Sequence, residues 1–433
     1  MQLKKYVPAL MAGVLSLAST LITAQPVLQT GKGPMPNAWI DAKTGHLIKR
    51  LVNMPGNHSS FYFHNNCFVD GKMVFYGSDY IHRDSSFVAD GYVNDRKDNP
   101  YNRQLFTYDL RSGAVRQLTH KSSSMNGEII SQVNHEAYFQ IKDSVFAVNI
   151  HTGKDRLVFV FPEDFKASIT TVNADGTLLA GAYSTPEEKE ISRKYPKKSE
   201  YFNRIYESRL PRTLFTINIQ TGKLNKIFTD SAWLNHVQFS TTDPDLLMFC
   251  HEGPWEKVDR IWTIHVAKPD TPRLIHKRTM YREIAGHEWF AADGSHIWYD
   301  LQLPRGEDFY IGGTELATGK ETKYHLKRNE WSVHFVSSPD QSYFIGDGGS
   351  PGSVAKSPDG QWIYRFYPQG EGAYVKSEKL VDMALDDYKL EPNVHITPNE
   401  KWVVFRANFE GHTDIYAVRM QKGKPSSLTQ GLQ

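Results

Sequence analysis

The chain has 433 residues, of which 12% are aromatic, and its 50 basic residues nearly balance its 48 acidic ones. This balance excludes the basic surface typical of nucleic-acid-binding proteins, and no long apolar span follows the N-terminal segment. Two cysteines, Cys67 and Cys250, are too few for a disulfide framework. Both lie in apolar runs, so we expect two buried free thiols.

Residues 1–24 have the features of a secretory signal peptide. Lys4 and Lys5 form a basic start, an apolar run follows, and the segment ends in small residues up to Ala24. The apolar run is too short to be read as a membrane-spanning helix. We therefore expect a soluble mature protein, residues 25–433, exported to a bacterial periplasm, with full secretion as the alternative.

One phrase recurs along the mature chain: a strand-like run, a turn that usually contains Thr-Gly or Ser-Gly, and a second strand. Its seven copies occupy residues 105–119, 145–161, 214–230, 261–277, 309–326, 363–380 and 414–429. Most copies follow a second phrase, a turn and then a strand, as in AADGSHIWYD. Repeats spaced by about 40–55 residues, each worth about four short strands, indicate a propeller. The sequence therefore predicts an all-β fold, a single-domain seven-bladed β-propeller.

Two segments depart from the regular repeat. An additional turn phrase at residues 39–52 has no preceding partner, and we expect it to pair with the last blade and close the ring. The alternative is an eighth, degenerate blade. Residues 185–212, rich in Lys, Glu and Tyr, predict a partly helical insert in blade three. Such a charged insert is either a solvated surface or a lid over one mouth of the channel.

Six histidines are expected at comparable places, at or just before the inner strand of a blade. They are His58, His236, His251, His287, His334 and His395. Inner strands line the channel of a propeller, so these side chains are expected to meet at one rim. A single such histidine would more often be an ordinary surface residue.

Two of these histidines, His251 and His287, are each followed by a glutamate and, further on, by an arginine, Arg260 and Arg305. An imidazole can act as a base near neutral pH, and a guanidinium binds carboxylates in a bidentate fork. The pattern therefore favours a site for an acidic substrate, with paired surface histidines as the plainer alternative.

A third pattern precedes the last repeat, where Glu391, Asn393 and His395 alternate. On a strand, alternate residues share one face. A carboxylate, an amide oxygen and an imidazole together suit a hard divalent ion such as Mn²⁺, Ca²⁺ or Mg²⁺. The equally weighted alternative is the polar start of an ordinary strand.

The phrases WLNHVQFS, CHEGPWEKVDRIW and GHEWF resemble those of the oligogalacturonate lyases, polysaccharide lyase family 22. The resemblance extends over most of the mature chain, and the family fold is a seven-bladed propeller. It implies β-elimination on short galacturonide oligosaccharides with a histidine base and a bound Mn²⁺. It also implies that His287 is the base and that His334 is a metal ligand.

The resemblance further implies that His236, His251 and Arg260 contact the substrate. Arg305 is expected to bind another carboxylate along the oligosaccharide. In such a reaction, the metal neutralises the carboxylate beside C5, and the imidazole takes the C5 proton.

The chain departs from the family pattern at the metal site. The family's His-x-His pair falls here on Glu391 and Asn393. A Glu-x-Asn pair can still bind a hard divalent ion, and His395 could assist it. We therefore expect a divergent branch of the family, with a metal held by His334, Glu391, Asn393 and His395.

A competing interpretation is a non-catalytic, TolB-like propeller that acts as a binding module in the cell envelope. It shares the signal peptide and the Asp-Gly hairpins, but it does not require His-Glu phrases at strand ends. A propeller that gates a peptidase is a third interpretation, but the chain has no hydrolase domain to accompany it.

Overall fold

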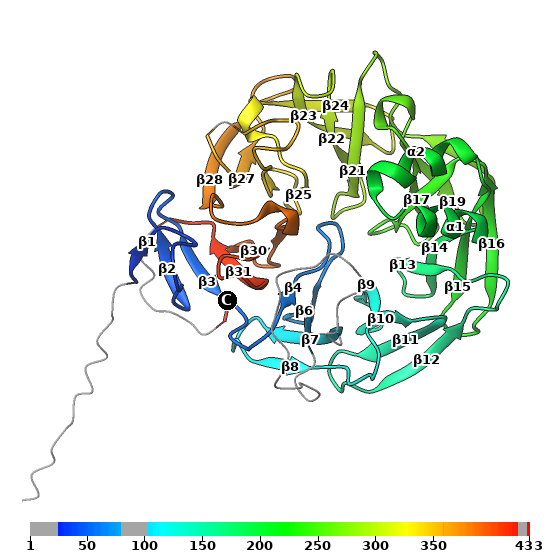
Figure 1. The fold of residues 1–433 in the computed structure, drawn as a ribbon, viewed down its shortest axis with the longest axis horizontal. Coiled ribbons are helices and arrows are strands. Elements are labelled where there is room, and N and C mark those ends of the chain that lie inside the picture. Colours follow the sequence, from blue (N-terminus) through cyan, green and yellow to red (C-terminus); the bar gives the residue numbers. More distant parts are fainter. Residues whose placement is uncertain (1–24, 79–102, 358, 423–430) are drawn as a thin grey trace, which may run out of the picture.

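The computed structural model describes residues 25–78, 103–357, 359–422 and 431–433. The expected signal peptide, residues 1–24, lies outside them. The described residues form seven mainly antiparallel sheets that stand side by side around a central channel, so the predicted seven-bladed propeller is confirmed (Figure 1). None of the described helices is both long and apolar enough to cross a membrane.

The first four blades follow the chain from the blue to the green part of Figure 1. Blade one contains β4 (His58–Ser59), β5 (Phe68–Val69), β6 (Lys72–Ser78), β7 (Arg103–Asp109) and β8 (Val115–Gln117). Blade two contains β9 (Asn126–Ser131), β10 (Glu136–Ile141), β11 (Ser144–Asn149) and β12 (Asp155–Val160). Blade three contains β13 (Ser168–Val172), β14 (Leu178–Ser184), β15 (Arg212–Asn218) and β16 (Leu224–Asp230). Blade four contains β17 (Trp233–Phe239), β18 (Leu246–Glu252), β19 (Ile261–His265) and β20 (Lys268–Leu274).

The last three blades complete the ring, and the described residues also form three short 3₁₀ helices, one inside blade four, one before blade six and one before blade seven. Blade five contains β21 (Ile284–Phe290), β22 (His296–Gln302), β23 (Phe309–Glu315) and β24 (Glu321–Leu326). Blade six contains β25 (Phe335–Ser337), β26 (Phe344–Gly346), β27 (Trp362–Tyr367) and β28 (Lys376–Asp382). Blade seven contains β29 (His395–Ile396), β30 (Trp402–Ala407), β31 (Asp414–Arg419), β3 (Leu47–Arg50), β2 (Ala38–Asp41) and β1 (Val27–Leu28). The 3₁₀ helices are η1 (Trp255–Lys257), η2 (Arg328–Glu330) and η3 (Tyr388–Leu390).

The core lies between neighbouring sheets. The second strand of each blade is packed on both faces, which explains near-continuous apolar runs such as LLMFC in β18 and WVVF in β30. Aromatic rings fill the wedge between blades, as where Trp39 and Phe405 both pack against Tyr416. Both cysteines are buried and unpaired, as expected.

The ring closes by joining the two ends of the described chain. Strand β3 pairs antiparallel with β31, and β2 extends the same sheet outward. The segment 39–52 is therefore the expected closing strand, and it does not begin an eighth blade. The pairing covers the edge that β31 would otherwise expose, and it explains why the early strands contribute to the last blade.

The insert between β14 and β15 is partly helical, as predicted, and belongs to blade three. It forms α1 (Pro186–Lys194) and α2 (Lys198–Ser208). Glu188 of α1 is buried and ion-paired with Arg212, while Phe202 of α2 packs on Trp233 at the start of β17, with ring centroids 5.1 Å apart. Helix α1 is thus tied to blade three and α2 is packed against blade four, and whether they open and close as a lid stays a prediction.

Blade one has an irregular inner edge that matters for the site. Its inner strand β4 has only two residues, and the chain from 60 to 67 leaves the sheet and enters the centre of the ring (Figure 1). Phe63 of this channel loop stacks on His334 of blade six at 4.7 Å between ring centroids. Its backbone N–H donates to the Asn393 side chain at 2.9 Å. The loop therefore links three blades across the channel.

Candidate active site

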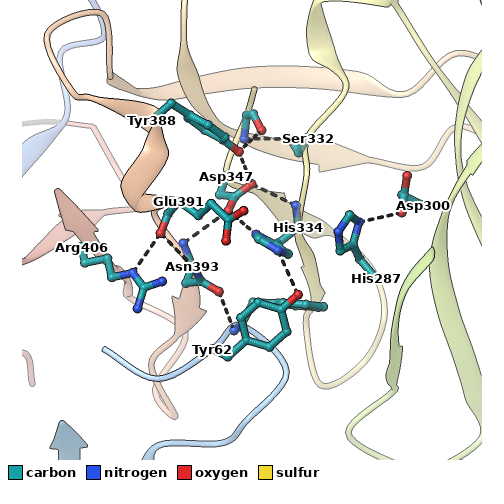
Figure 2. A network of polar contacts seen from close by, with 12 residues as sticks. Tyr62, His287, Asp300, Ser332, His334, Asp347, Tyr388, Glu391, Asn393 and Arg406 are labelled. Atoms are coloured by element: carbon teal, nitrogen blue, oxygen red, sulfur yellow. Dashed lines mark hydrogen bonds and ion pairs between the residues drawn. The ribbon is translucent and has the colours of Figure 1, made fainter. Parts of the chain in front are cut away.

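Two histidine–aspartate pairs lie side by side on blades five and six (Figure 2). Nδ1 of His287 lies 2.9 Å from Oδ1 of Asp300, and Nδ1 of His334 lies 2.8 Å from Oδ2 of Asp347. Both aspartates are buried. The two imidazole rings are 4.9 Å apart between centroids and nearly perpendicular.

The position of His287 follows from a β-bulge in strand β21. The pairing with β22 shifts register between Gly286 and Trp289, and His287 takes a left-handed φ of 46°. His236 in β17 has the same φ of 46° at an equivalent bulge. A bulge adds a residue and redirects its side chain, which here turns both imidazoles out of the strand alternation.

The two paired histidines differ in their access to a ligand. Because Asp300 and Asp347 each accept a hydrogen bond from Nδ1–H, each imidazole is left with Nε2 as its reactive nitrogen. The His287 side chain is 18% exposed, whereas that of His334 is 1% exposed and its Nε2 lies 3.2 Å from the Tyr62 hydroxyl. Burial, and then the Glu391 carboxylate, hold the pKa of Tyr62 well above its usual range. Of the two imidazoles, that of His287 is therefore the one that a ligand can reach from solvent.

A buried charge network lies directly behind His287. The Arg260 guanidinium donates from Nη1 to Glu252 at 2.7 Å and from Nε to Glu288 at 3.1 Å. Glu252 in turn lies 3.3 Å from Nε2 of His236. Burial alone would raise the pKa of Glu252, but Arg260 and His236 outweigh it and hold that pKa well below its usual range.

Arg260 is 3% exposed, and both of its neighbouring carboxylates are buried. Its expected direct contact with substrate stays a prediction, since the observed partners of its guanidinium are protein groups. Trp255 in η1 covers this network, with its ring 4.9 Å from the Arg260 guanidinium and 5.1 Å from the His287 ring. Arg260 thus joins the two glutamates, and Trp255 positions the imidazole beside them.

The expected metal ligands do not share one strand face, so that part of the sequence argument was wrong. Glu391 and Asn393 precede the strand, which begins at His395, and both take left-handed φ values, 54° and 47°. The Asn393 amide accepts from the Phe63 N–H and donates to the Glu391 carbonyl. Nε2 of His395 lies 2.9 Å from the Phe61 carbonyl oxygen.

Two of the four expected ligands still present donor atoms suitable for a divalent ion. The first is Nε2 of His334, which lies 3.2 Å from the Tyr62 hydroxyl. The second is the Glu391 carboxylate, whose negative charge raises the pKa of the same hydroxyl. In this part of the described chain, the three ligand-type residues that converge within 4.8 Å are instead His236, Cys250 and Glu252. Burial raises the pKa of the Cys250 thiol well above its usual range, which disfavours a thiolate ligand.

The six histidines do not form one ring. His58 is fully buried between blades, 3.3 Å from Asp414. His251 lies on the second strand of blade four, not on an inner strand, and stacks on Trp262 at 4.8 Å between ring centroids. The four others lie on inner strands or directly before one, and only His287 and His334 have rings in mutual contact.

Arg305 follows β22, and its expected contact with a substrate carboxylate stays a prediction. Its side chain is 48% exposed and lies 3.0 Å from Glu256 of η1, beside Trp255. Of the two arginines expected to bind substrate, Arg305 is therefore the one whose guanidinium is open to a ligand from solvent, because Arg260 is buried.

Several residues of the site were missed by sequence reasoning. Asp300 and Asp347 each follow their histidine by 13 residues in matching hairpins, HEWFAADGSHIWYD and HFVSSPDQSYFIGD. This repeated spacing could have identified them. Tyr62 and His64 of the channel loop carry no such pattern, because a non-local contact places them.

His64 lies in the channel among the other histidines. Burial, and then the proximity of His236 and His334, lower its pKa to about 3. The ring is therefore neutral at ordinary pH, and it can donate or accept one hydrogen bond without adding charge.

His395 gives the first testable prediction, on stability. Burial lowers its pKa to about 4, although the hydrogen bond with the Phe61 carbonyl opposes the shift. The unfolded chain binds a proton near pH 6.5, and the folded chain binds it only near pH 4, so this residue's contribution is lost as pH falls between these values. Between pH 6.5 and pH 4, we expect the free energy of unfolding to fall by about 3 kcal/mol less in His395→Gln than in wild type. Urea denaturation of both proteins across this pH range measures the difference. An equal pH slope in both proteins would contradict this assignment.

Comparisons with known proteins agree with the architecture. A family model described as oligogalacturonate lyase matches residues 36–424. The oligogalacturonide lyase of Pectobacterium atrosepticum is 25% identical over 396 residues, covering 88% of this chain and 95% of that protein. The oligogalacturonate lyase of Dickeya dadantii is 23% identical over 395 residues, with the same coverage of 88% and 95%.

Solved structures show the same fold. An oligogalacturonate lyase from Vibrio parahaemolyticus superimposes with a TM-score of 0.73 at 22% identity, covering 89% of this chain and 96% of that chain. An oligogalacturonate lyase in complex with manganese gives a TM-score of 0.71 at 20% identity, covering 89% and 96%.

Proposed function

The chain belongs to the oligogalacturonate lyase family, and on that basis we propose that it cleaves short, pectin-derived oligogalacturonides by β-elimination in a bacterial periplasm. The observation that carries the proposal is the His287–Asp300 pair, a partly exposed imidazole held by a buried carboxylate in the channel. The periplasmic location rests on the signal-peptide features of residues 1–24.

In the proposed reaction, Nε2 of His287 takes the proton from C5 of a galacturonate unit. The electron pair of the C5–H bond forms a C4–C5 double bond, the C4–O bond breaks, and the departing sugar oxygen gains a proton from water. Asp300 keeps the Nδ1 proton in place and stabilises the imidazolium that forms. The bulge at His287 fixes the direction of the ring, which is a condition for efficient proton transfer.

The substrate carboxylates require positive or hydrogen-bonding partners. We assign Arg305 to a carboxylate at the mouth of the channel, because its guanidinium is half-exposed. His236 faces the channel from the bulge of β17 and is assigned to the sugar bound at His287. His251 and Arg260 complete the substrate contacts that the family resemblance implies, and Arg260 also holds the two glutamates behind the site.

A divalent ion, Mn²⁺ by the family resemblance, would be held by His334 and Glu391. When bound, it supplies positive charge that neutralises the carboxylate beside C5 and so favours loss of the proton. Asp347 supports that role, because its carboxylate fixes the His334 ring through Nδ1. Asn393 and His395 are engaged with the backbone and are assigned to holding the channel loop.

The binding-module alternative is not favoured. A module that only binds sugars has no need of a buried aspartate behind a partly exposed histidine, nor of a second such pair 4.9 Å away between ring centroids. Titratable groups whose orientation is fixed by buried carboxylates in this way are typical of catalytic sites.

The proposal is tested by incubating the mature protein with digalacturonate and trigalacturonate. We expect unsaturated product, measured by its ultraviolet absorbance and, in parallel, by chromatography of the sugars. Unchanged substrate with galacturonides and with other uronides, from protein that still binds them, would contradict the lyase and support the binding module.

Metal dependence is measured in the same assay, with chelator and then with restored Mn²⁺. We expect the chelator to lower the rate and added Mn²⁺ to restore it. In Glu391→Gln, the Mn²⁺ concentration that gives half of the maximal rate is expected to rise at least about tenfold. Asn393→Gly is the matched comparison, because glycine accepts the left-handed φ of 47° and the amide that it removes is occupied by backbone groups. A rate indifferent to chelator and to Glu391→Gln would contradict the metal assignment.

A further inference from the structure

A second group of side chains of the metal-ligand type lies outside the candidate active site. It consists of Asp70 in the turn between β5 and β6, His135 in the turn between β9 and β10, and His151 in the turn between β11 and β12. We propose that these three residues form a second divalent transition-metal site, of the Zn²⁺ class, which joins blade one to blade two.

The three side chains converge on one point. Oδ2 of Asp70 lies 2.5 Å from Nδ1 of His135 and 2.9 Å from Nε2 of His151. Their ligand-type atoms all fall within 4.8 Å of one another, and the two rings are 5.7 Å apart between centroids. Both imidazoles thus direct a nitrogen at the same carboxylate oxygen, and a bound metal ion would take the place of the protons shared in these two contacts.

The backbone holds these residues in place before any ion binds. His135 has a left-handed φ of 52°, and its carbonyl accepts the Ile150 N–H at 3.0 Å. The His151 carbonyl accepts from Nη1 of Arg116 at 2.8 Å. Asp70 also has a left-handed φ, 48°, in a tight turn. Because all three come from turns anchored to strands, binding requires little additional ordering.

The ligand set selects the metal. Two imidazole nitrogens and one carboxylate oxygen suit Zn²⁺ and its neighbours better than the oxygen-seeking Ca²⁺ or Mg²⁺. Three protein ligands leave a tetrahedral position for water. The His135, His151 and Asp70 side chains are 48%, 46% and 35% exposed, so an ion can enter from solvent.

This site is distinct from the candidate active site. The second strands of the blades end at the active-site face, as β18 does at Glu252 and β22 does beside Asp300. Asp70 and His135 precede the starts of β6 and β10, so they lie on the opposite face of the ring. The proposal therefore stands whether or not the lyase assignment holds.

The test is calorimetric titration of the purified mature protein with Zn²⁺. The variants are His135→Asn, which tolerates the left-handed backbone, and His151→Asn. The matched control is His265→Asn, because exposed His265 lies 3.1 Å from Asp245 as a simple His–Asp pair. We expect each of the two site variants to bind Zn²⁺ at this site at least about tenfold more weakly than wild type. The control variant is expected to bind Zn²⁺ as wild type does.

A second readout distinguishes coordination at these residues from loose association. Co²⁺ in place of Zn²⁺ is expected to give visible absorption bands of a low-coordinate ion in wild type, and weaker bands in both site variants. Zn²⁺ is also expected to raise the melting temperature of wild type more than that of either variant. Equal Zn²⁺ affinity and equal Co²⁺ spectra in wild type, His135→Asn and His151→Asn would overturn the proposal.

Discussion

Replacing His287 by asparagine is expected to lower kcat by about 10²–10⁴-fold, the usual contribution of a positioned general base. Asparagine is the sharpest replacement because His287 has a φ of 46°, and Asn tolerates that conformation better than Ala. The backbone bulge should therefore persist, and KM should change much less than kcat. The measurement is the initial rate of unsaturated product formation across a range of trigalacturonate concentrations.

His287→Gly gives a second, independent test of the base. Glycine accepts the positive φ and leaves space where the imidazole was, so added imidazole is expected to restore part of the lost rate. His296→Asn is the control, because His296 lies on the same hairpin but stacks on Trp298 away from the pair. Activity of His287→Asn within a few fold of wild type, or no rescue of His287→Gly, would point to another base.

Asp300 is a positioning residue in this scheme, since it acts through the imidazole. Its buried Oδ2 has no hydrogen-bond partner among the described residues, so its contact with Nδ1 of His287 through Oδ1 is the main polar contact of the carboxylate. Its role is to select the tautomer that leaves Nε2 free for the substrate, and a neutral amide there can select the wrong one. The His287 variants thus probe the proton acceptor, and Asp300 probes its orientation.

Much of the fold could be predicted because its signals are local. Thr-Gly and Asp-Gly turns between alternating strands repeat seven times, and each hairpin forms from residues close in sequence. The closing strand was predictable for the same reason, since 39–52 carries the same phrase. The helical insert in blade three interrupts this repeat and was visible as a change of composition.

The candidate site was predicted less completely because it depends on contacts between distant segments. The His287 and His334 positions follow from strand ends, but the burial of His58 depends on Asp414, which closes the ring from the far end of the chain. The left-handed backbone conformations of Glu391 and Asn393 interrupt the strand geometry that would place alternate side chains on one face. The channel loop that carries Tyr62 is placed by blades six and seven, which no local pattern records.

Replacing Arg260 by methionine is expected to lower the free energy of unfolding by about 3–5 kcal/mol, the usual cost of leaving a buried ion pair without one partner. Arg260 holds both Glu252 and Glu288, and Oε1 of Glu288 is buried without a hydrogen-bond partner. The loss of the guanidinium therefore leaves two carboxylates without their shared counter-charge. Urea denaturation near pH 8 measures the effect.

Compensating substitutions separate this network role from a direct contact between Arg260 and substrate. If the network dominates, the triple variant Arg260→Met, Glu252→Gln, Glu288→Gln is expected to recover part of the lost stability, because no buried charge remains. Arg260→Met with normal stability and a raised KM would instead show that the guanidinium mainly binds a substrate carboxylate.

The pH dependence of this difference has a definite sign. In wild type, Arg260 and His236 hold the pKa of Glu252 below its unfolded value of 4.5, so the stability from that carboxylate is present above pH 4.5 and is lost as pH falls through the folded pKa. In Arg260→Met, burial without the guanidinium disfavours the charged carboxylates, so the variant gains stability as they take up protons. The stability gap between the two proteins is therefore expected to narrow from pH 8 toward about pH 4. A gap that stays constant over this range would show that the methionine acts through lost packing around Trp255, with the charges playing no part.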